Sequence, residues 1–166
     1  MPAHFILSKE IAYRKLHRMA YEIAERNINE KQIIIAGIKE NGSIIAAILV
    51  TFLKDIFKGQ LKIIEIRIDK KDPKNISVSE KINFDNKTII ITDDVANSGK
   101  TLLYAIKPFL EFYPKRIQTL VLVERSYKEF PVSPDYVGLS VSTALTEKII
   151  VETSNGEIDG AKLLTN

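Results

Sequence analysis

The chain has 166 residues, of which 45% are hydrophobic and 27% charged, with a formal net charge of +3, no cysteine and two histidines. This length and composition are typical of a soluble globular protein, and we expect residues 1–166 to form one domain. The absence of cysteine excludes a disulfide framework and thiolate chemistry, and two histidines argue against a histidine-based metal site. The mild positive charge permits an anionic substrate but does not by itself indicate nucleic acid binding.

Neither a targeting segment nor a membrane span is expected. Residues 1–7 lack the charged start and long apolar core of a signal peptide, and the longest apolar stretch, residues 44–50, is too short to cross a bilayer. We therefore expect a cytoplasmic protein without a membrane partner.

The first part of the chain predicts a helix, a strand and a second helix. Ser8 can cap a helix that runs to about Asn27. Residues 33–36 form a short buried strand that breaks at Gly37, and residues 44–57 form a very apolar helix. The apolar face of the first helix has helical spacing and consists of Ala12, Leu16, Met19, Ala20 and Ile23.

The middle of the chain changes its pattern twice. Residues 61–68 alternate apolar and charged side chains, which predicts a strand with one exposed face or an edge position. Residues 69–87 are polar and contain Pro73, so we expect a mobile loop with a short strand at 76–78.

The second half predicts further strands and one helix. Residues 89–92 are a buried strand, and a helix follows it to about Phe112. The tail from Thr153 is polar. The remaining strands are expected at 117–123, 136–141 and 148–151.

This order predicts an α/β fold. Strands that are apolar throughout and alternate with helices indicate a mostly parallel central sheet with helices on both faces. Ligands of such folds bind at the carboxyl ends of the strands. The loops after Ala36 and after Thr92 both lie at that edge.

The stretch 89–102, Ile-Ile-Ile-Thr-Asp-Asp-Val-Ala-Asn-Ser-Gly-Lys-Thr-Leu, carries the strongest functional signal. A buried carboxylate without a partner is costly, so we expect Asp93 and Asp94 at the end of the strand, facing solvent or a ligand. The small residues from Ala96 to Gly99 allow backbone amides to close around an anion, and a helix beginning at Thr101 adds the positive end of its dipole. A phosphate suits the loop, and sugar hydroxyls suit the acids.

Two other interpretations of this stretch are open. Residues 98–101 look like the end of a nucleotide-triphosphatase P-loop, but that motif needs a glycine where this chain has Asp94, whose carboxylate would repel a triphosphate. A plain turn from strand to helix with a solvated pair of acids would also produce the pattern.

The whole stretch resembles the phosphoribosyl-pyrophosphate (PRPP) binding motif of type I phosphoribosyltransferases. The resemblance implies the fold of that group, with a small hood beside the central sheet. It implies that Asp93 and Asp94 are the catalytic acids that hold the ribose hydroxyls. It implies that the 5′-phosphate is bound by Ala96, Asn97, Ser98, Gly99, Lys100 and Thr101.

A wider similarity, over about residues 11–151, is to the pyrimidine-operon regulator (PyrR) family. It rests on residues 23–27, 37–39, 121–125, 135–138 and 147–151. Members of that family are RNA-binding attenuation proteins that also act as uracil phosphoribosyltransferases. The similarity implies transfer of the phosphoribosyl group of PRPP to a nucleobase, with uracil as the favoured base. It also implies a homodimer. It implies Mg²⁺ carried by PRPP, with Asp93 as the one candidate for direct contact. The alternative is a regulator that senses PRPP or nucleotide and binds RNA, with weak or no catalysis.

The same similarity assigns two further parts of the active site. Gly37, Ile38 and Lys39 correspond to the pyrophosphate loop, although the arginine expected at Asn41 is absent. Purine enzymes of the type I group carry a lysine at the position of Glu124 and an acid at the position of Asn97. Neither is present, which favours a pyrimidine. The base is expected to contact Glu124, Arg125, Val141 and Thr143.

The family's RNA surface is only partly present. Arg14, Arg18 and Lys128 could contact RNA phosphates, but Ser133 and Leu139 stand where basic residues are expected. An ordinary amphipathic helix with solvated charges accounts for the same pattern.

The loop 69–87 is also shorter than in that family and lacks its arginine. Its available cations are lysines, which lack the bidentate fork of arginine, so we predict slow catalysis with ligand binding preserved.

Overall fold

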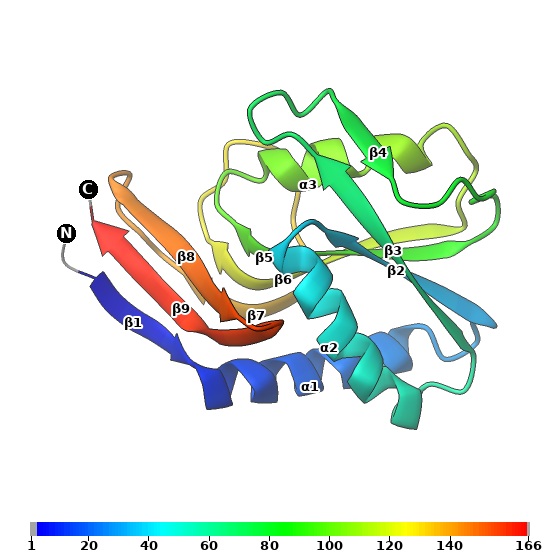
Figure 1. Cartoon of the computed structure of the whole chain (residues 1–166), viewed down its shortest axis with the longest axis horizontal. Helices are drawn as coiled ribbons and strands as arrows, with labels where there is room; N and C mark the ends of the chain where they lie inside the picture. The colour runs from blue at the N-terminus through cyan, green and yellow to red at the C-terminus, as the bar shows by residue number, and fades with distance from the viewer. Residues whose placement is uncertain (1–2, 166) are drawn as a thin grey trace.

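The computed structural model describes residues 3–165 and contains a six-stranded and a three-stranded sheet (Figure 1). The central sheet has the order β4-β3-β2-β5-β6-β7. Its strands β3, β2, β5, β6 and β7 are parallel to their neighbours, and β4 pairs antiparallel with β3. The bounds are β2 Gln32–Ile38, β3 Gln60–Ile68, β4 Ile76–Val78, β5 Thr88–Ala96, β6 Arg116–Arg125 and β7 Tyr136–Val141.

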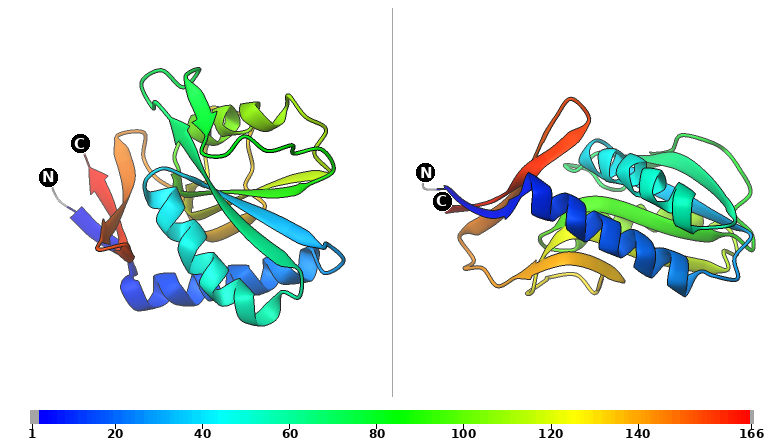
Figure 2. Two further views of the ribbon diagram at one scale, coloured as in Figure 1. Left: turned by 45° about the vertical axis from the view of Figure 1, so that its right-hand side comes forward. Right: turned by 90° about the horizontal axis from the view of Figure 1, so that it is seen from below.

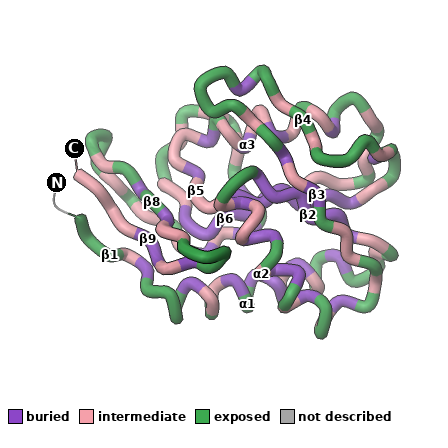
Figure 3. Tube along the Cα trace, in the orientation of Figure 1, coloured by how far each residue is buried: buried purple, intermediate pink, exposed green. Residues whose placement is uncertain are grey.

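Helices cover both faces of this sheet, as predicted. α1 (Lys9–Arg26) and α2 (Asn41–Ile56) pack against one face, and α3 (Lys100–Ala105) with the 3-10 helix η1 (Lys107–Phe109) packs against the other (Figures 1 and 2). Successive residues of a strand point to opposite faces, so β2 serves both cores. Its Ile33 and Ile35 pack with α1 and α2, whereas Ile34 and Ala36 join the core under α3. Figure 3 shows the buried residues gathered in the central strands.

The first helix confirms its prediction closely. The Ser8 hydroxyl accepts a hydrogen bond from the Ile11 amide at 3.3 Å, which caps the helix. The five residues predicted for its apolar face are its five buried residues.

Two strands are longer than predicted. β2 continues through Gly37 to Ile38, because Gly37 still pairs with Glu65 of β3 and Thr92 of β5. β5 continues through both acids to Ala96, because it keeps its pairing with β6 over that length. Ladder pairing on a neighbouring strand therefore extends each strand beyond the end that its own sequence indicates.

The helix after β5 is shorter than predicted. α3 ends at Ala105, and the chain continues as the 3-10 helix Lys107–Phe109 instead of reaching Phe112 as one α-helix. Pro108 explains the difference, since a proline lacks the amide hydrogen and clashes with the carbonyl four residues earlier. The dipole that this helix contributes at loop 96–101 comes from six residues only.

A hood stands beside one end of the central sheet (Figure 2). It is the antiparallel sheet β1-β9-β8, formed by β1 Ala3–Ser8, β8 Glu147–Ser154 and β9 Glu157–Thr165. The sequence predicted β8 only as a strand at 148–151, and neither β9 nor β1 was predicted. The Asn155-Gly156 turn, with φ of 50° and 75°, joins β8 to β9. Such a pair is a strong hairpin signal in the sequence.

The span between β3 and β5 contains the predicted short strand β4. Residues 69–75 form a turn in which the Asp69 amide donates to the Asn75 carbonyl at 3.3 Å, and the Asp69 carboxylate accepts from the Lys71 amide at 2.9 Å. The mobility predicted for residues 69–87 stays a prediction.

Candidate functional site

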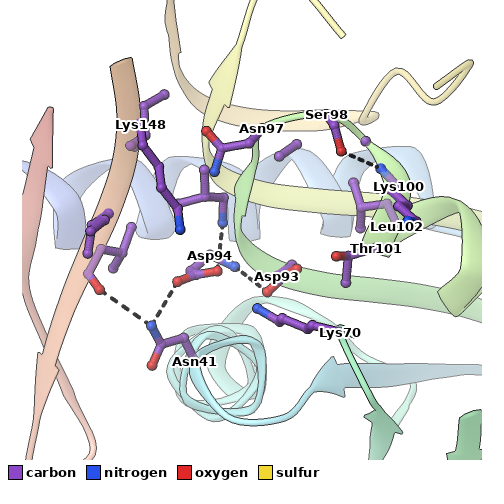
Figure 4. Close-up of a pocket in the computed structure, with 16 residues that line it drawn as sticks. Asn41, Lys70, Asp93, Asp94, Asn97, Ser98, Lys100, Thr101, Leu102 and Lys148 are labelled. Atoms are coloured by element: carbon purple, nitrogen blue, oxygen red, sulfur yellow. Dashed lines mark hydrogen bonds between the residues drawn. The ribbon is translucent and has the colours of Figure 1, made fainter. Parts of the chain in front are cut away.

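A cavity of about 370 Å³ opens at the carboxyl end of β5 (Figure 4). β5 and the following loop supply its floor, residues 148–151 of β8 supply the hood side, and Asn41 and Lys70 complete the wall. Both predicted acids and all six residues predicted to bind a 5′-phosphate line it. The strand-end position expected from the sequence is therefore where the acids and the small-residue loop meet.

Both acids were predicted to face solvent or a ligand; Asp93 lines the cavity but is buried, with 2% of its surface exposed. Burial raises the pKa of the Asp93 carboxyl well above its ordinary value, and the negative charge of Asp94 adds to the rise. The Lys70 ammonium and the Asp94 amide, which donates to Asp93 Oδ1 at 2.9 Å, act in the opposite direction. Burial therefore favours a protonated Asp93.

Asp94 is half-buried and is held from two sides. Its Oδ1 accepts a hydrogen bond from the Val95 amide at 2.8 Å, and its Oδ2 accepts one from Asn41 Nδ2 at 2.7 Å. Charge-assisted bonds of this length fix a carboxylate firmly. The carboxylate therefore has a defined orientation toward the cavity.

Loop 96–101 turns sharply between β5 and α3. Gly99 has a φ of 85°, and the Ser98 hydroxyl accepts from the Lys100 amide at 3.2 Å. The Ser98 carbonyl accepts from the amides of Glu129 and Phe130, both at 3.0 Å. The segment after β6 thus braces this loop from behind, an arrangement that the sequence did not indicate.

The predicted pyrophosphate residues lie outside the main cavity. Gly37 and Ile38 end β2, and the Lys39 amide donates to the Ile66 carbonyl at 2.9 Å. Lys39 lines a separate depression of about 460 Å³ together with Arg67. The cations that line the main cavity are Lys70, Lys100 and Lys148, so the structure does not bring residues 37–39 together with the acids there.

Two cavity residues were missed as site residues. Asn41 was considered only as a missing arginine, although its place after the Gly37–Lys39 turn was a signal for it. Lys148 enters from β8, and the sequence offers no local sign that this strand folds over the loop. Lys70, considered only as one of several loop lysines, reaches the cavity with its ammonium near Asp93 (Figure 4).

None of the residues predicted to bind the base lines the main cavity. Glu124 forms an ion pair with Lys128 at 2.7 Å, and Arg125 donates to the Glu147 carbonyl at the start of β8. Val141 accepts from the Ser126 amide at 3.0 Å. Among residues 3–165, the hydroxyl of Thr143 is buried without a hydrogen-bond partner. Of these residues, Arg125 connects β6 to the hood.

The side chain of Asn97 lines the cavity, but its amide oxygen is buried. Within the described part of the chain this oxygen has no hydrogen-bond partner.

The three residues predicted to contact RNA are all in ion pairs. Arg14 pairs with Glu10 at 2.6 Å on the exposed face of α1. Arg18 pairs with Glu22 and donates to the carbonyls of Val137 at 3.0 Å and Gly138 at 3.2 Å. Lys128 lies beside loop 96–101 and forms a salt bridge with Glu124. An RNA role for these residues stays a prediction.

Within residues 3–165, no helix is long and apolar enough to cross a membrane. Over the same residues, no cluster of three or more His, Cys, Asp or Glu side chains could hold a metal ion by itself.

The fold and this cavity define a phosphoribosyltransferase domain. Residues 5–155 match the family model described as the phosphoribosyl transferase domain, and the chain belongs to that family. This confirms the resemblance and the fold class that the sequence predicted.

Among curated proteins the chain is similar to bifunctional PyrR proteins. It is 36% identical over 170 residues to the bifunctional protein pyrR of Enterococcus faecalis (strain ATCC 47077 / OG1RF), covering 97% of this chain and 94% of that protein. It is 31% identical over 160 residues to the bifunctional protein PyrR of Haemophilus ducreyi, covering 90% and 89%.

Solved structures show the same fold. The hypoxanthine phosphoribosyltransferase of Trypanosoma cruzi has a TM-score of 0.80 at 16% identity, over 97% of this chain and 95% of that chain. A hypoxanthine-guanine phosphoribosyltransferase of Bacillus anthracis has a TM-score of 0.72 at 19% identity, over 90% and 88%. Identities this low support the fold and carry no assignment of substrate.

Proposed function

We propose that this protein transfers the phosphoribosyl group of PRPP to uracil, giving UMP and pyrophosphate. The bond between the ribose anomeric carbon and the diphosphate oxygen breaks, a bond to the uracil ring nitrogen N1 forms, and N1 loses its proton to solvent. The observation that carries the proposal is one cavity lined by both Asp93 and Asp94 and by every residue of loop 96–101.

The acids and the loop divide the recognition of a ribose 5-phosphate between them. Asp94 presents an oriented carboxylate that accepts hydrogen bonds from the ribose hydroxyls. Loop 96–101 receives the phosphate with its backbone amides and with the hydroxyl groups of Ser98 and Thr101. The negative charge of Asp94 also favours the positive, oxocarbenium-like sugar ring that develops as the diphosphate departs.

Lysines supply positive charge for the departing diphosphate. Lys70 lies near Asp93, and Lys148 lines the cavity from the hood (Figure 4). Each is a point charge without the planar fork of an arginine, so it cannot hold a diphosphate through two parallel hydrogen bonds. We therefore expect slow turnover together with well-preserved binding of PRPP or UMP.

The site suits a Mg²⁺ ion that arrives with PRPP. Asp93 and Asp94 are adjacent carboxylates in the cavity, and two carboxylates are too few for a cage made of protein ligands alone. Mg²⁺ is commonly bound in this way, by one or two carboxylates with substrate oxygens and water completing the shell. When bound, the ion would neutralise charge on the leaving diphosphate; Asp93 is the candidate for direct contact and would have to lose its proton to bind the ion.

Uracil is proposed as the base because the purine-type side chains are absent. Asn97 is neutral where an acid acts on the purine ring in the type I enzymes, and the carboxylate of Glu124 is held by Lys128. The names of the two relatives, bifunctional pyrR and PyrR, agree with a protein of the pyrimidine pathway.

A second candidate is a nucleotide-sensing regulator that binds RNA and catalyses weakly or not at all. The word bifunctional in the relatives' names favours it, as do the arginines of α1 that lie beside the start of β7. We include a homodimer and a cytoplasmic location in both candidates. Sedimentation of the purified protein tests the dimer.

A direct assay tests the proposed function. The protein is mixed with PRPP, Mg²⁺ and one base at a time, and pyrophosphate is measured. Release that requires uracil supports the proposal. Pyrophosphate release with hypoxanthine or guanine and not with uracil would show that the base is a purine and contradict the proposed substrate.

A further inference from the structure

Asn41 connects Asp94 to the hood through a single side chain. Its Nδ2 donates to Asp94 Oδ2 at 2.7 Å and to the Val151 carbonyl at 3.4 Å, and its Oδ1 accepts from the Thr153 hydroxyl at 3.1 Å (Figure 4). The orientation of the amide follows from its neighbours, because a carboxylate and a carbonyl only accept whereas a hydroxyl can donate. One amide therefore bridges the acid and two residues of β8.

The backbone of Asn41 has a fixed position. It is the first residue of α2, and the next residue, Gly42, packs directly on β5. The Thr92 hydroxyl donates to the Gly42 carbonyl at 2.8 Å, and a Cβ on Gly42 would lie only 2.4 Å from the Thr92 carbonyl oxygen. The start of α2 is thus locked to the strand that carries the acids, so the Asn41 amide is the adjustable part of the connection.

The bonds to Asp94 leave it able to bind two more donors. A carboxylate has about four acceptor sites. The Val95 amide and Asn41 occupy one on each oxygen. The two that remain equal the number of free hydroxyls, 2′ and 3′, on the ribose of PRPP or UMP, and Asn41 decides which way they point.

We propose that Asn41 is a positioning residue that couples the hood to ribose binding by holding Asp94 and Thr153 in one hydrogen-bonded chain. This inference rests on the proposed function. An amide suits the role because it donates and accepts at once. A cationic side chain at this position would be able to donate to Asp94 but unable to accept from Thr153.

Binding of two probes separates this role from general damage to the site. Ribose 5-phosphate uses the acids and loop 96–101, whereas inorganic phosphate uses the loop alone. Affinities for both are measured by NMR titration on the unchanged protein, Asn41→Ala, Thr153→Val and the double variant. Thr51→Val is the matched control, because the Thr51 hydroxyl bonds only to the Ala47 carbonyl within the exposed face of α2.

The expected pattern is selective and not additive. Asn41→Ala should weaken ribose 5-phosphate about tenfold, the loss of one charge-assisted bond, and leave inorganic phosphate unchanged. Thr153→Val should weaken ribose 5-phosphate about threefold in the unchanged protein and have no further effect in Asn41→Ala. Thr51→Val should change neither affinity.

A reciprocal measurement applies even if Asn41→Ala unfolds. Coupling between two sites acts in both directions, so ribose 5-phosphate should slow hydrogen exchange of the β8 amides in the unchanged protein and less so in Thr153→Val. Effects that add in the double variant, or an equal loss of inorganic phosphate, would overturn the inference and leave the proposed function standing. No binding of ribose 5-phosphate by the unchanged protein would overturn both.

Discussion

Lys128 forms a 2.7 Å ion pair with Glu124 directly beside loop 96–101, with only 13% and 16% of the two side chains exposed. The two charged groups are close, but the Glu124 carboxylate oxygen does not meet the geometry of a hydrogen bond, so the contact is mainly electrostatic. The backbone of the next two residues, Glu129 and Phe130, holds the Ser98 carbonyl. The pair therefore fixes the segment that braces the loop.

Removing one member of this pair should destabilise the protein. Glu124→Gln leaves the Lys128 ammonium largely buried without a counter-charge, and we expect a loss of about 2 kcal/mol in the free energy of unfolding. The double variant Glu124→Leu, Lys128→Met removes both charges and should recover most of it. Urea denaturation measures both effects. Equal losses in the single and double variants would show that the pair has no such role.

The buried Asp93 predicts a pH dependence of stability. Its pKa is raised well above the ordinary 3.8, so the folded protein holds the proton more tightly than the unfolded chain. The contribution of Asp93 to the free energy of unfolding should therefore be largest below about pH 3.8. It should fall as the pH rises toward the pKa of Asp93 in the folded protein, and it should change no further above that pKa. Asp93→Asn removes this dependence.

The measurement is urea denaturation of both proteins at several pH values. The stability of Asp93→Asn relative to the unchanged protein should rise with pH, by at most about 1.4 kcal/mol per pH unit. A difference that stays constant with pH would mean that Asp93 titrates normally.

Lys70 should matter for PRPP more than for UMP, because only PRPP carries the diphosphate. We expect Lys70→Met to raise the KM for PRPP about tenfold and to change the affinity for UMP little, which steady-state kinetics and calorimetry can compare. Lys71→Met is the matched control, since Lys71 belongs to the same turn but does not line the cavity. Equal effects of the two substitutions would assign the result to the general charge of the turn.

The RNA-binding candidate makes a prediction about salt. If Arg14 and Arg18 contact phosphates, replacing either by Gln should lower the slope of log affinity against log salt by about 1. Filter binding with pyrimidine-leader hairpins across a salt series measures this slope. A slope unchanged by both substitutions would exclude these arginines from phosphate binding and leave them with the contacts they make within the protein.

The sequence predicted the parts of the fold that local pattern controls. The cap at Ser8, the buried face of α1 and the short strand β4 follow from side-chain chemistry and spacing within a few residues. The extension of β5 to Ala96 does not, because it depends on pairing with β6, which is distant in sequence. The β8–β9 hairpin was missed although Asn155-Gly156 signals it, since the polar tail masked the alternation of its strands.

The candidate site divides in the same way. The acids and loop 96–101 are consecutive in the sequence, so their motif alone predicts that they lie in one site. Asn41, Lys70 and Lys148 reach the cavity from three other elements, and their arrival depends on tertiary packing. The burial of Asp93 likewise comes from the continued strand and not from its own neighbours in sequence.

Pyrophosphate release in the presence of PRPP, Mg²⁺ and uracil tests the central claim most directly. We predict that release requires uracil, that UMP forms in equal amount, and that turnover falls below the range of about 1 to 1000 per second common among enzymes. Asp94→Asn should abolish it without unfolding the protein. Tight binding of PRPP or UMP with no pyrophosphate released for uracil or any other base would contradict the account and identify the protein as a sensor.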